Sequence, residues 1–114
     1  MVEVHRGDVV ICDLNPVIGS EQSGRRPAIV MQVEAANLRS PHTIVVPFTT
    51  KIRQRILASH VLVRAGTAGL IEDSVALCEQ VRVIDMRRVV RVLGRLDDDQ
   101  LREVESAMRV ILGL

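Results

Sequence analysis

Aromatic residues are almost absent from this 114-residue chain, which has one Phe and no Trp or Tyr. Its core must therefore be built from Val, Ile, Leu, Met and Ala. The apolar content of 47% and the charged content of 25% are typical of a folded protein and exclude an intrinsically disordered chain. The length predicts one domain over residues 1–114. Because so small a domain leaves much of its surface exposed, burial against a second copy is a natural remedy.

Further absences concern targeting and cysteine chemistry. The first ten residues, MVEVHRGDVV, lack the apolar segment of a secretory signal, and no apolar run is long enough to cross a bilayer. The two cysteines, Cys12 and Cys78, show neither a CxxC pattern nor the Cys/His spacing of a zinc site. We therefore expect both to be buried apolar residues of a protein in the reducing cytoplasm, without a membrane association.

Familiar catalytic motifs are also missing. The chain contains no P-loop, GxGxxG, HExxH or GxSxG pattern and no paired metal-ligand cluster. The three histidines, His5, His42 and His60, are far apart in sequence, so they do not define a two-histidine nuclease pair. His60 opens an expected strand, where a structural imidazole is the more common role. We predict neither a cofactor nor a metal site.

Short β-branched segments fill most of the chain. We expect strands at 8–14, 26–34, 43–50, 60–65, 74–85 (one long or two short) and 89–96, with a turn or short helix at 35–42. After residue 97 the apolar residues recur three or four apart, which predicts an amphipathic helix with Asp97 as N-cap and Gln100 completing a capping box. The run of three Asp is interpreted as a helix start and not as a metal site. The pattern predicts a mainly β fold with a small antiparallel barrel or curved sheet and a C-terminal helix.

Positive charge is concentrated in the second quarter of the chain. Residues 25–55 carry six basic residues against one acidic residue, although the net charge of the whole chain is only +1. The preceding segment, 15–24, is a loop longer than the usual hairpin connection of about 2–5 residues. Loops of this length within a small domain are often functional.

Arg25 and Arg26 stand where this loop becomes a strand. Pro27 restricts Arg26 to extended conformations, so its side chain projects in a defined direction that suits bidentate contact with a phosphate. The alternative is an ordinary strand-end arginine in solvent. Thr49 ends the expected third strand, where its hydroxyl could donate to a phosphoryl oxygen or position a ribose hydroxyl.

Three sequence blocks carry a family resemblance. They are GSEQ-x-G-x-RP at 19–27, P-x-T at 47–49 and DS-x4-EQ-x-R-x-ID at 73–85. In their order and spacing, along essentially the whole chain, the sequence resembles the MazF/PemK family of toxin endoribonucleases (mRNA interferases) of type II toxin–antitoxin systems.

The resemblance implies an SH3-like barrel, a homodimer, and sequence-specific, metal-independent cleavage of single-stranded mRNA. It also implies neutralisation by a cognate MazE-like antitoxin that lays an acidic tail across the RNA-binding groove. The catalytic arginine and threonine of the family fall on Arg26 and Thr49. The positions that line the RNA groove fall on Ser20, Glu21, Gln22, Ser74 and Gln80, with Arg25 as general electrostatic help.

The implied reaction is attack of a ribose 2′-hydroxyl on its own 3′-phosphate, which leaves a 2′,3′-cyclic phosphate and a 5′-hydroxyl. The protein then contributes in-line positioning and charge stabilisation, the second of which suits Arg26. Glu21 is a candidate proton acceptor, although a solvated loop carboxylate is the more common role. The alternatives are an RNA-binding barrel without activity, and a non-catalytic toxin of the same fold that binds a protein such as gyrase. The gyrase-binding toxins depend on a C-terminal tryptophan, whereas this chain ends VILGL.

Overall fold

The computed structural model describes residues 2–16, 18, 19, 21, 24–52 and 57–114. The strands in this part of the chain are β1 (Asp8–Asp13), β2 (Arg25–Val30), β3 (His42–Thr49), β4 (His60–Val63), β5 (Ser74–Leu77), β6 (Arg82–Asp85) and β7 (Val89–Arg95). The helices are α1 (Glu34–Asn37) and α2 (Asp98–Leu112), with 3-10 turns η1 (Cys78–Gln80) and η2 (Met86–Arg88).

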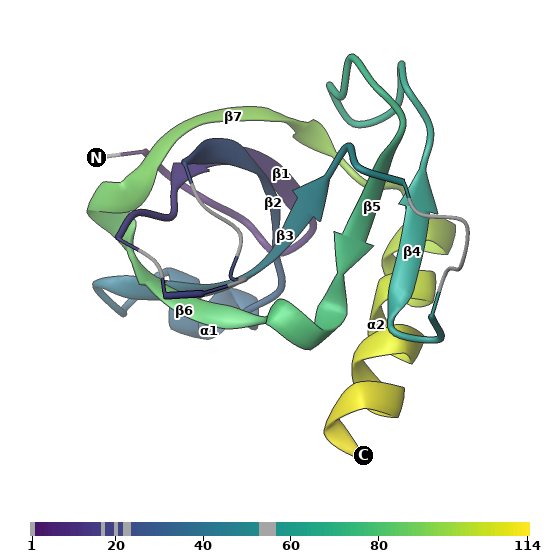
Figure 1. Ribbon diagram of the computed structural model, residues 1–114. Helices are drawn as coiled ribbons and strands as arrows, with labels where there is room; N and C mark the ends of the chain where they lie inside the picture. The colour runs from purple at the N-terminus through teal and green to yellow at the C-terminus, as the bar shows by residue number, and fades with distance from the viewer. Residues whose placement is uncertain (1, 17, 20, 22–23, 53–56) are drawn as a thin grey trace.

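The strands form one antiparallel sheet in the order β4-β5-β3-β2-β1-β7, with β6 paired to β3 outside this path. The long strand β3 pairs with β6 along its first half and with β5 at its end. Strong curvature brings β7, β1, β2, β3 and β6 into a ring, with β4, β5 and α2 beside it (Figure 1). Within the described ranges no ladder joins β6 to β7, so the molecule is barrel-like without being closed. The predicted small antiparallel barrel with a C-terminal helix is confirmed.

The central strands of the sheet are buried on both faces. Because side chains alternate along a strand, β1, β2 and β3 each contribute to two apolar clusters. The inner cluster lies inside the ring and includes Val10, Cys12, Leu14, Ala28, Val30, Val45 and Ile84. The outer cluster lies between the sheet and α2 and includes Val9, Ile29, Val46, Phe48, Cys78, Val104 and Ala107.

Both cysteines are free and buried, as predicted. Burial raises the pKa of the Cys12 thiol to about 11, although nearby arginines act in the opposite direction. Burial likewise raises the pKa of the Cys78 thiol to about 11. Since only the thiolate is a strong nucleophile, both side chains serve as apolar core residues at neutral pH.

The element boundaries differ from the prediction where polar side chains intervene. The predicted strand 26–34 ends at Val30, because the buried amide of Asn37 donates to the Gln32 backbone carbonyl at 3.1 Å and folds the chain into α1. The segment 74–85 forms two short strands separated by η1. The C-terminal helix has its predicted capping box, in which the backbone N–H of Gln100 donates to Asp97 Oδ1 at 2.8 Å.

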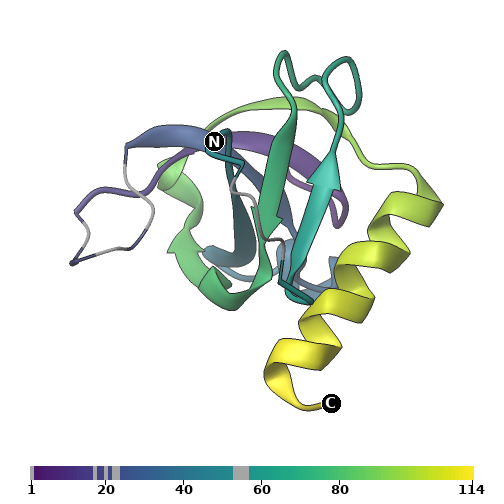
Figure 2. The same cartoon turned by 45° about the vertical axis from the view of Figure 1, so that its right-hand side comes forward.

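Helix α2 packs against β4 and η1 and lies across one side of the sheet (Figure 2). The loop that joins β4 to β5 lies at one end of these two strands, and the C-terminus of α2 lies toward their other end (Figure 2). In the described part of the chain, no helix is long and apolar enough to cross a membrane.

Candidate functional site

Arg26 and Thr49 lie at the same end of the barrel. Strands β2 and β3 are antiparallel, with Ala28 opposite Pro47. Continuing this register by two residues sets Arg26 opposite Thr49. The Arg26 Nη1 atom donates a hydrogen bond to the Phe48 carbonyl at 3.3 Å. The guanidinium is therefore anchored to the end of β3, directly beside the threonine.

Both side chains belong to the inner face of the ring. Arg26 is two residues before Ala28, and Thr49 is four residues after Val45; Ala28 and Val45 are both in the inner cluster. Since residues two or four apart on a strand share a face, Arg26 and Thr49 point into the mouth of the barrel. Arg26 is half-buried and Thr49 is buried, so both hold defined positions.

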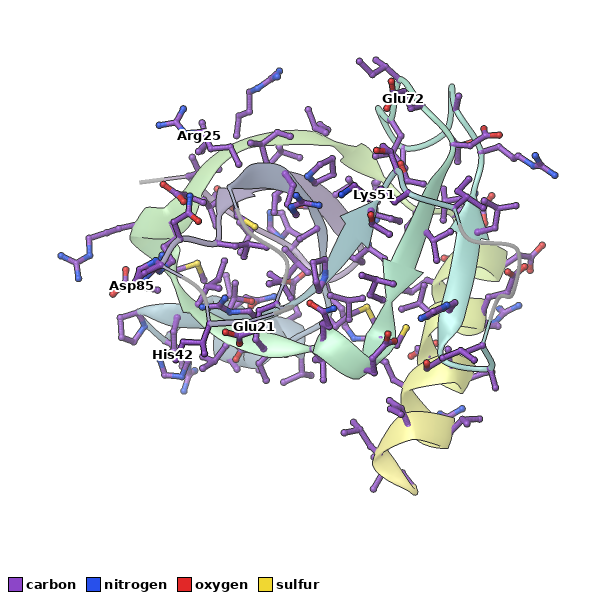
Figure 3. All side chains as sticks on the ribbon, viewed as in Figure 1. Glu21, Arg25, His42, Lys51, Glu72 and Asp85 are labelled. Carbon is purple, nitrogen blue, oxygen red and sulfur yellow. The ribbon has the colours of Figure 1, made fainter. Side chains whose placement is uncertain are left out.

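Arg25 is separated from this site by strand alternation. It pairs in register with Asp13 and projects from the outer face of β2. Its side chain is exposed, and Figure 3 shows it extending away from the ring of strands. The structure thus places the two adjacent arginines on opposite faces, with only Arg26 at the mouth.

The Thr49 hydroxyl is oriented by the backbone that follows it. Its Oγ1 atom accepts a hydrogen bond from the Lys51 amide at 3.2 Å. A hydroxyl has one hydrogen to donate and two lone pairs to accept with. The bond from Lys51 uses a lone pair and leaves the hydroxyl hydrogen to be donated elsewhere.

Two further arginines surround the end of β1 that faces this mouth. Arg82 Nη1 donates to the Leu14 carbonyl at 3.4 Å. Arg88 Nη1 donates to the Asp13 carbonyl at 3.2 Å and also to the Asn15 carbonyl. Both side chains tie the chain leaving β1 to the β6–β7 segment.

Three of these cations act on the buried Cys12 thiol. Burial raises the pKa of this thiol most and Asp13 raises it further, whereas Arg82, Arg26 and Arg88 each lower it. Three guanidinium groups from β2, β6 and η2 therefore act on one point near the end of β1. Arg82 and Arg88 were not identified from the sequence as site residues. The spacing of Arg82 could have identified it: it stands two residues before Ile84, which is buried on the inner face, and residues two apart on a strand share a face.

Glu21 and Gln80 are brought together from distant parts of the sequence. They line a cavity of about 220 Å³ together with Leu14, Pro47, Glu79, Val81 and Arg82. Within the loop, Glu21 Oε1 accepts the Ile18 amide at 2.6 Å. Ser20 and Gln22, which were predicted to bind RNA with them, lie outside the described residues.

Ser74 occupies a different face from Thr49. Val75 of β5 is the register partner of Thr49, so the neighbouring Ser74 projects to the other side of the sheet. Ser74 is buried, and its Oγ donates to the Glu72 carbonyl at 3.0 Å. Its part in RNA binding stays a prediction.

Glu79 anchors one wall of the cavity to β4. The Leu57 amide donates to His60 Nδ1 at 3.3 Å, which requires the other ring nitrogen, Nε2, to carry the proton in the neutral ring. His60 Nε2 then donates to Glu79 Oε2 at 2.8 Å, and Ser59 Oγ donates to Glu79 Oε1 at 3.0 Å. Partial burial raises the pKa of the Glu79 carboxyl, but these hydrogen bonds outweigh it and hold the pKa below its ordinary value. His60 is thus a structural imidazole, as expected.

Among the described residues, no group of three or more His, Cys, Asp or Glu side chains is arranged to hold a metal ion. The site therefore presents guanidinium groups, a hydroxyl and amides at the open end of a small barrel. These are donor groups suited to phosphate oxygens, and they define a small, mainly β protein with several arginines around the mouth of its barrel.

Comparison with known proteins identifies the family. A model described as "PemK-like, MazF-like toxin of type II toxin-antitoxin system" matches residues 5–112. Endoribonuclease EndoA of Bacillus subtilis strain 168 is 42% identical over 111 residues, which are 97% of this chain and 96% of that protein. The chain belongs to the PemK/MazF family of toxins.

Solved structures agree with this assignment. MazF of Deinococcus radiodurans (Form-I) matches with a TM-score of 0.80 and 29% identity, over 95% of this chain and 94% of that one. The MazE–MazF complex of Deinococcus radiodurans (Form-II) matches with a TM-score of 0.78 and 28% identity, over 98% and 97% of the two chains. Both matches extend over nearly the whole chain.

Proposed function

We propose that this protein is a sequence-specific endoribonuclease toxin that cleaves single-stranded mRNA without a metal ion. The observation that carries the proposal is the pairing of Arg26 with Thr49 on the inner face of the barrel mouth, where Arg26 is anchored to the Phe48 carbonyl at 3.3 Å. Membership of the toxin family and the 42% identity to an endoribonuclease support it.

The proposed reaction is attack of a ribose 2′-hydroxyl on the adjacent 3′-phosphate. The 2′-oxygen forms a bond to phosphorus, the bond to the 5′-oxygen breaks, and the products carry a 2′,3′-cyclic phosphate and a 5′-hydroxyl. Because the nucleophile belongs to the substrate, the protein need only align the reacting atoms and stabilise the charge on the phosphoryl oxygens.

Arg26 is assigned the charge-stabilising role. Its guanidinium presents N–H donors in a planar fork that matches two phosphate oxygens. Thr49 is assigned the second donor, since the bond from Lys51 leaves its hydroxyl hydrogen to point at a phosphoryl oxygen or the 2′-hydroxyl. Arg82 and Arg88 add positive potential at the same mouth, which favours the approach of a polyanion.

We further propose that the toxin works as a cytoplasmic homodimer neutralised by a MazE-like antitoxin. The structure of MazE–MazF from Deinococcus radiodurans supports the choice of partner. An exposed apolar group at the end of α2 supports self-association, because large exposed apolar patches mark interaction sites. Its members are Val110, Ile111, Leu112 and Leu114.

The test is incubation of purified protein with a long mixed-sequence RNA, followed by mapping of the product ends. We expect discrete cuts with 5′-hydroxyl ends that persist in EDTA. Arg26→Ala and Thr49→Ala should each abolish cleavage while the circular dichroism spectrum stays that of the parent. Arg64→Ala, which removes an exposed arginine paired with Asp73 on the β4–β5 hairpin, is the matched control and should cleave normally.

Different outcomes point to different functions. Full activity of both site variants would refute the assigned residues. Loss of activity in EDTA with rescue by a divalent cation would indicate another nuclease chemistry. RNA binding without cuts would indicate an inactive RNA-binding barrel, and inhibition of gyrase with neither binding nor cuts would indicate the protein-binding alternative.

A further inference from the structure

The cavity lined by Glu21 and Gln80 has the size of a site for one ring system. Its volume of about 220 Å³ is smaller than the roughly 300–1,000 Å³ of pockets that enclose a drug-sized ligand. Leu14, Pro47 and Val81 provide its apolar surface. An apolar slot of this kind suits the flat faces of a nucleobase, and not a whole nucleotide with its charged phosphate.

The polar groups of the cavity include both a cationic donor and an anionic acceptor. Arg82 is held by its bond to the Leu14 carbonyl at 3.4 Å, and Glu21 by its bond from the Ile18 amide at 2.6 Å. A guanidinium carries five N–H donors and an ionised carboxylate has about four acceptor positions, so one structural bond does not saturate either group. Glu79 is instead committed to Ser59 and His60 and forms a wall.

The cavity adjoins the proposed reaction site. Pro47, which lines it, is two residues before Thr49 on the same face of β3. Two residues along a strand span about 6.6 Å, which is comparable to the separation of a base from the phosphate of its own nucleotide. A base in the cavity therefore belongs to a nucleotide that flanks the phosphate held by Arg26 and Thr49.

We infer that this cavity binds one RNA base that carries both an amino group and a carbonyl group, namely cytosine or guanine. Arg82 donates to the carbonyl oxygen and Glu21 accepts from the amino group, as arginine and carboxylates do at the edges of guanine and cytosine. Uracil fits poorly because its N3–H lies between two carbonyl oxygens that a carboxylate repels. Adenine offers Arg82 only ring nitrogens.

This inference takes RNA as the ligand from the proposed function, and its test uses no cleavage. Uniformly ¹⁵N-labelled protein is titrated with CMP, GMP, AMP and UMP, and the shifts of the Gln80 side-chain amide and of Arg82 Nε–H are followed by NMR. We expect saturable shifts with CMP or GMP, and an apparent affinity at least about tenfold weaker for UMP, the difference that one well-placed hydrogen-bonded pair supplies. Comparing the CMP and GMP titrations shows which of the two bases is preferred.

Variants connect the preference to the two residues. Arg82→Met should remove the preference for CMP or GMP over UMP, and Glu21→Gln should reduce it, because an amide can turn its NH₂ toward a uracil carbonyl. Arg64→Met, on the β4–β5 hairpin, is the matched control and should leave it unchanged. If Arg82→Met does not fold, Glu21→Gln, at an exposed position, carries the same test.

Equal shifts with all four nucleotides, shifts confined to other parts of the protein, or no shift at millimolar nucleotide would overturn the inference. So would an unchanged preference in Glu21→Gln and Arg82→Met. Failure of the proposed function is recognised separately, as the absence of cuts in the end-mapping experiment. Base preference without cleavage would leave the cavity as a nucleobase site on a non-catalytic barrel.

Discussion

Arg25 and Arg26 are adjacent in sequence but have different surroundings in the structure. Arg25 is exposed on the outer face of β2 opposite Asp13, whereas Arg26 is half-buried at the mouth and donates to Phe48. The difference follows from the two-residue period of a strand. It makes the pair a natural internal comparison, because the same substitution can be made at either position.

Arg26→Lys should reduce the cleavage rate about 10²-fold or more, the usual loss when one preorganised donor is removed from a developing oxyanion. Lysine keeps the charge but lacks the planar fork that can contact Phe48 and a phosphate together. Arg25→Lys, which keeps the exposed charge, should stay within about threefold of the parent, since exposed charges contribute weakly. Single-turnover cleavage of a fixed RNA measures both, and equal effects at the two positions would contradict the assignment.

Two glycines govern how the β4–β5 hairpin crosses β7. A Cβ atom built on Gly94 would lie 2.5 Å from the Ala68 carbonyl carbon, and one on Gly69 would lie 2.3 Å from the Leu93 carbonyl oxygen. Both contacts are with backbone, which cannot swing aside as a side chain can. The hairpin and β7 therefore approach closely only because these two positions lack a side chain.

Gly94→Ala should lower the free energy of unfolding by about 1–3 kcal/mol, the usual cost of forcing an added methyl group into a packed contact. Urea denaturation followed by circular dichroism measures the change. Val92→Thr, on the same strand and 41% exposed, is the control and should shift stability by no more than about 0.5 kcal/mol. A Gly94→Ala protein as stable as the parent would show that the crossing can open at no cost.

Helix α2 begins with a complete capping box. The Gln100 amide donates to Asp97 Oδ1 at 2.8 Å, and the Asp97 amide donates to Gln100 Oε1 at 3.1 Å. Asp97→Ala should therefore cost about 1 kcal/mol of stability, as N-cap removals commonly do. Asp97→Asn keeps an oxygen acceptor at this position and should retain most of the stability that Asp97→Ala loses. Thermal and urea unfolding of the three proteins provide the comparison, and an Asn variant as unstable as Ala would argue against the cap.

At the scale of the whole molecule, four carboxyl groups make stability depend on acid. The pKa is lowered for Glu34, Asp73, Glu79 and Asp85, in the last case to about 2. Hydrogen bonds from the Arg87 side chain and amide are the main cause at Asp85. A group whose pKa is lower in the folded state stabilises the fold above its unfolded pKa, and this stabilisation is lost as the pH falls through the folded value.

We expect the urea concentration at the midpoint of unfolding to be constant above about pH 5 and to decrease as the pH is lowered. The fall should begin near 4.5, the ordinary pKa of glutamate, and continue to about 2. Glu79→Gln should flatten the early part of this fall and Asp85→Asn the late part, because each variant removes one titrating group. Midpoints that increase toward low pH, or variants whose pH profiles match that of the parent, would contradict the predicted loss of stability in acid.

Much of the fold was predictable from local patterns. Alternating β-branched residues located the strands to within a few residues, and the Asp97–Gln100 spacing located the start of α2. The exception was the segment after Val30, where the pattern suggested a longer strand. The buried amide of Asn37 forms its bonds there only once Gln32 and Thr43 are packed around it, which is information that no local window contains.

The site was predictable only in part. The sequence alone shows that Arg26 precedes Pro27 and that Thr49 ends an expected strand. That these two residues lie close together depends on the pairing of β2 with β3. Arg82 and Arg88 were missed, because each acts on a segment distant in sequence: Arg82 on Leu14 and Arg88 on Asp13.

The sequence by itself determined which segments become strands or helix and which residues carry chemistry, because side-chain periodicity and capping are local properties. Only the tertiary structure decided which of those residues meet. The curvature of one sheet sets Arg26 beside Thr49 and turns Arg25 away, and it forms a cavity in which Glu21 meets Gln80 and Arg82 from a distant segment of the chain. Those contacts follow from register and packing across the whole chain.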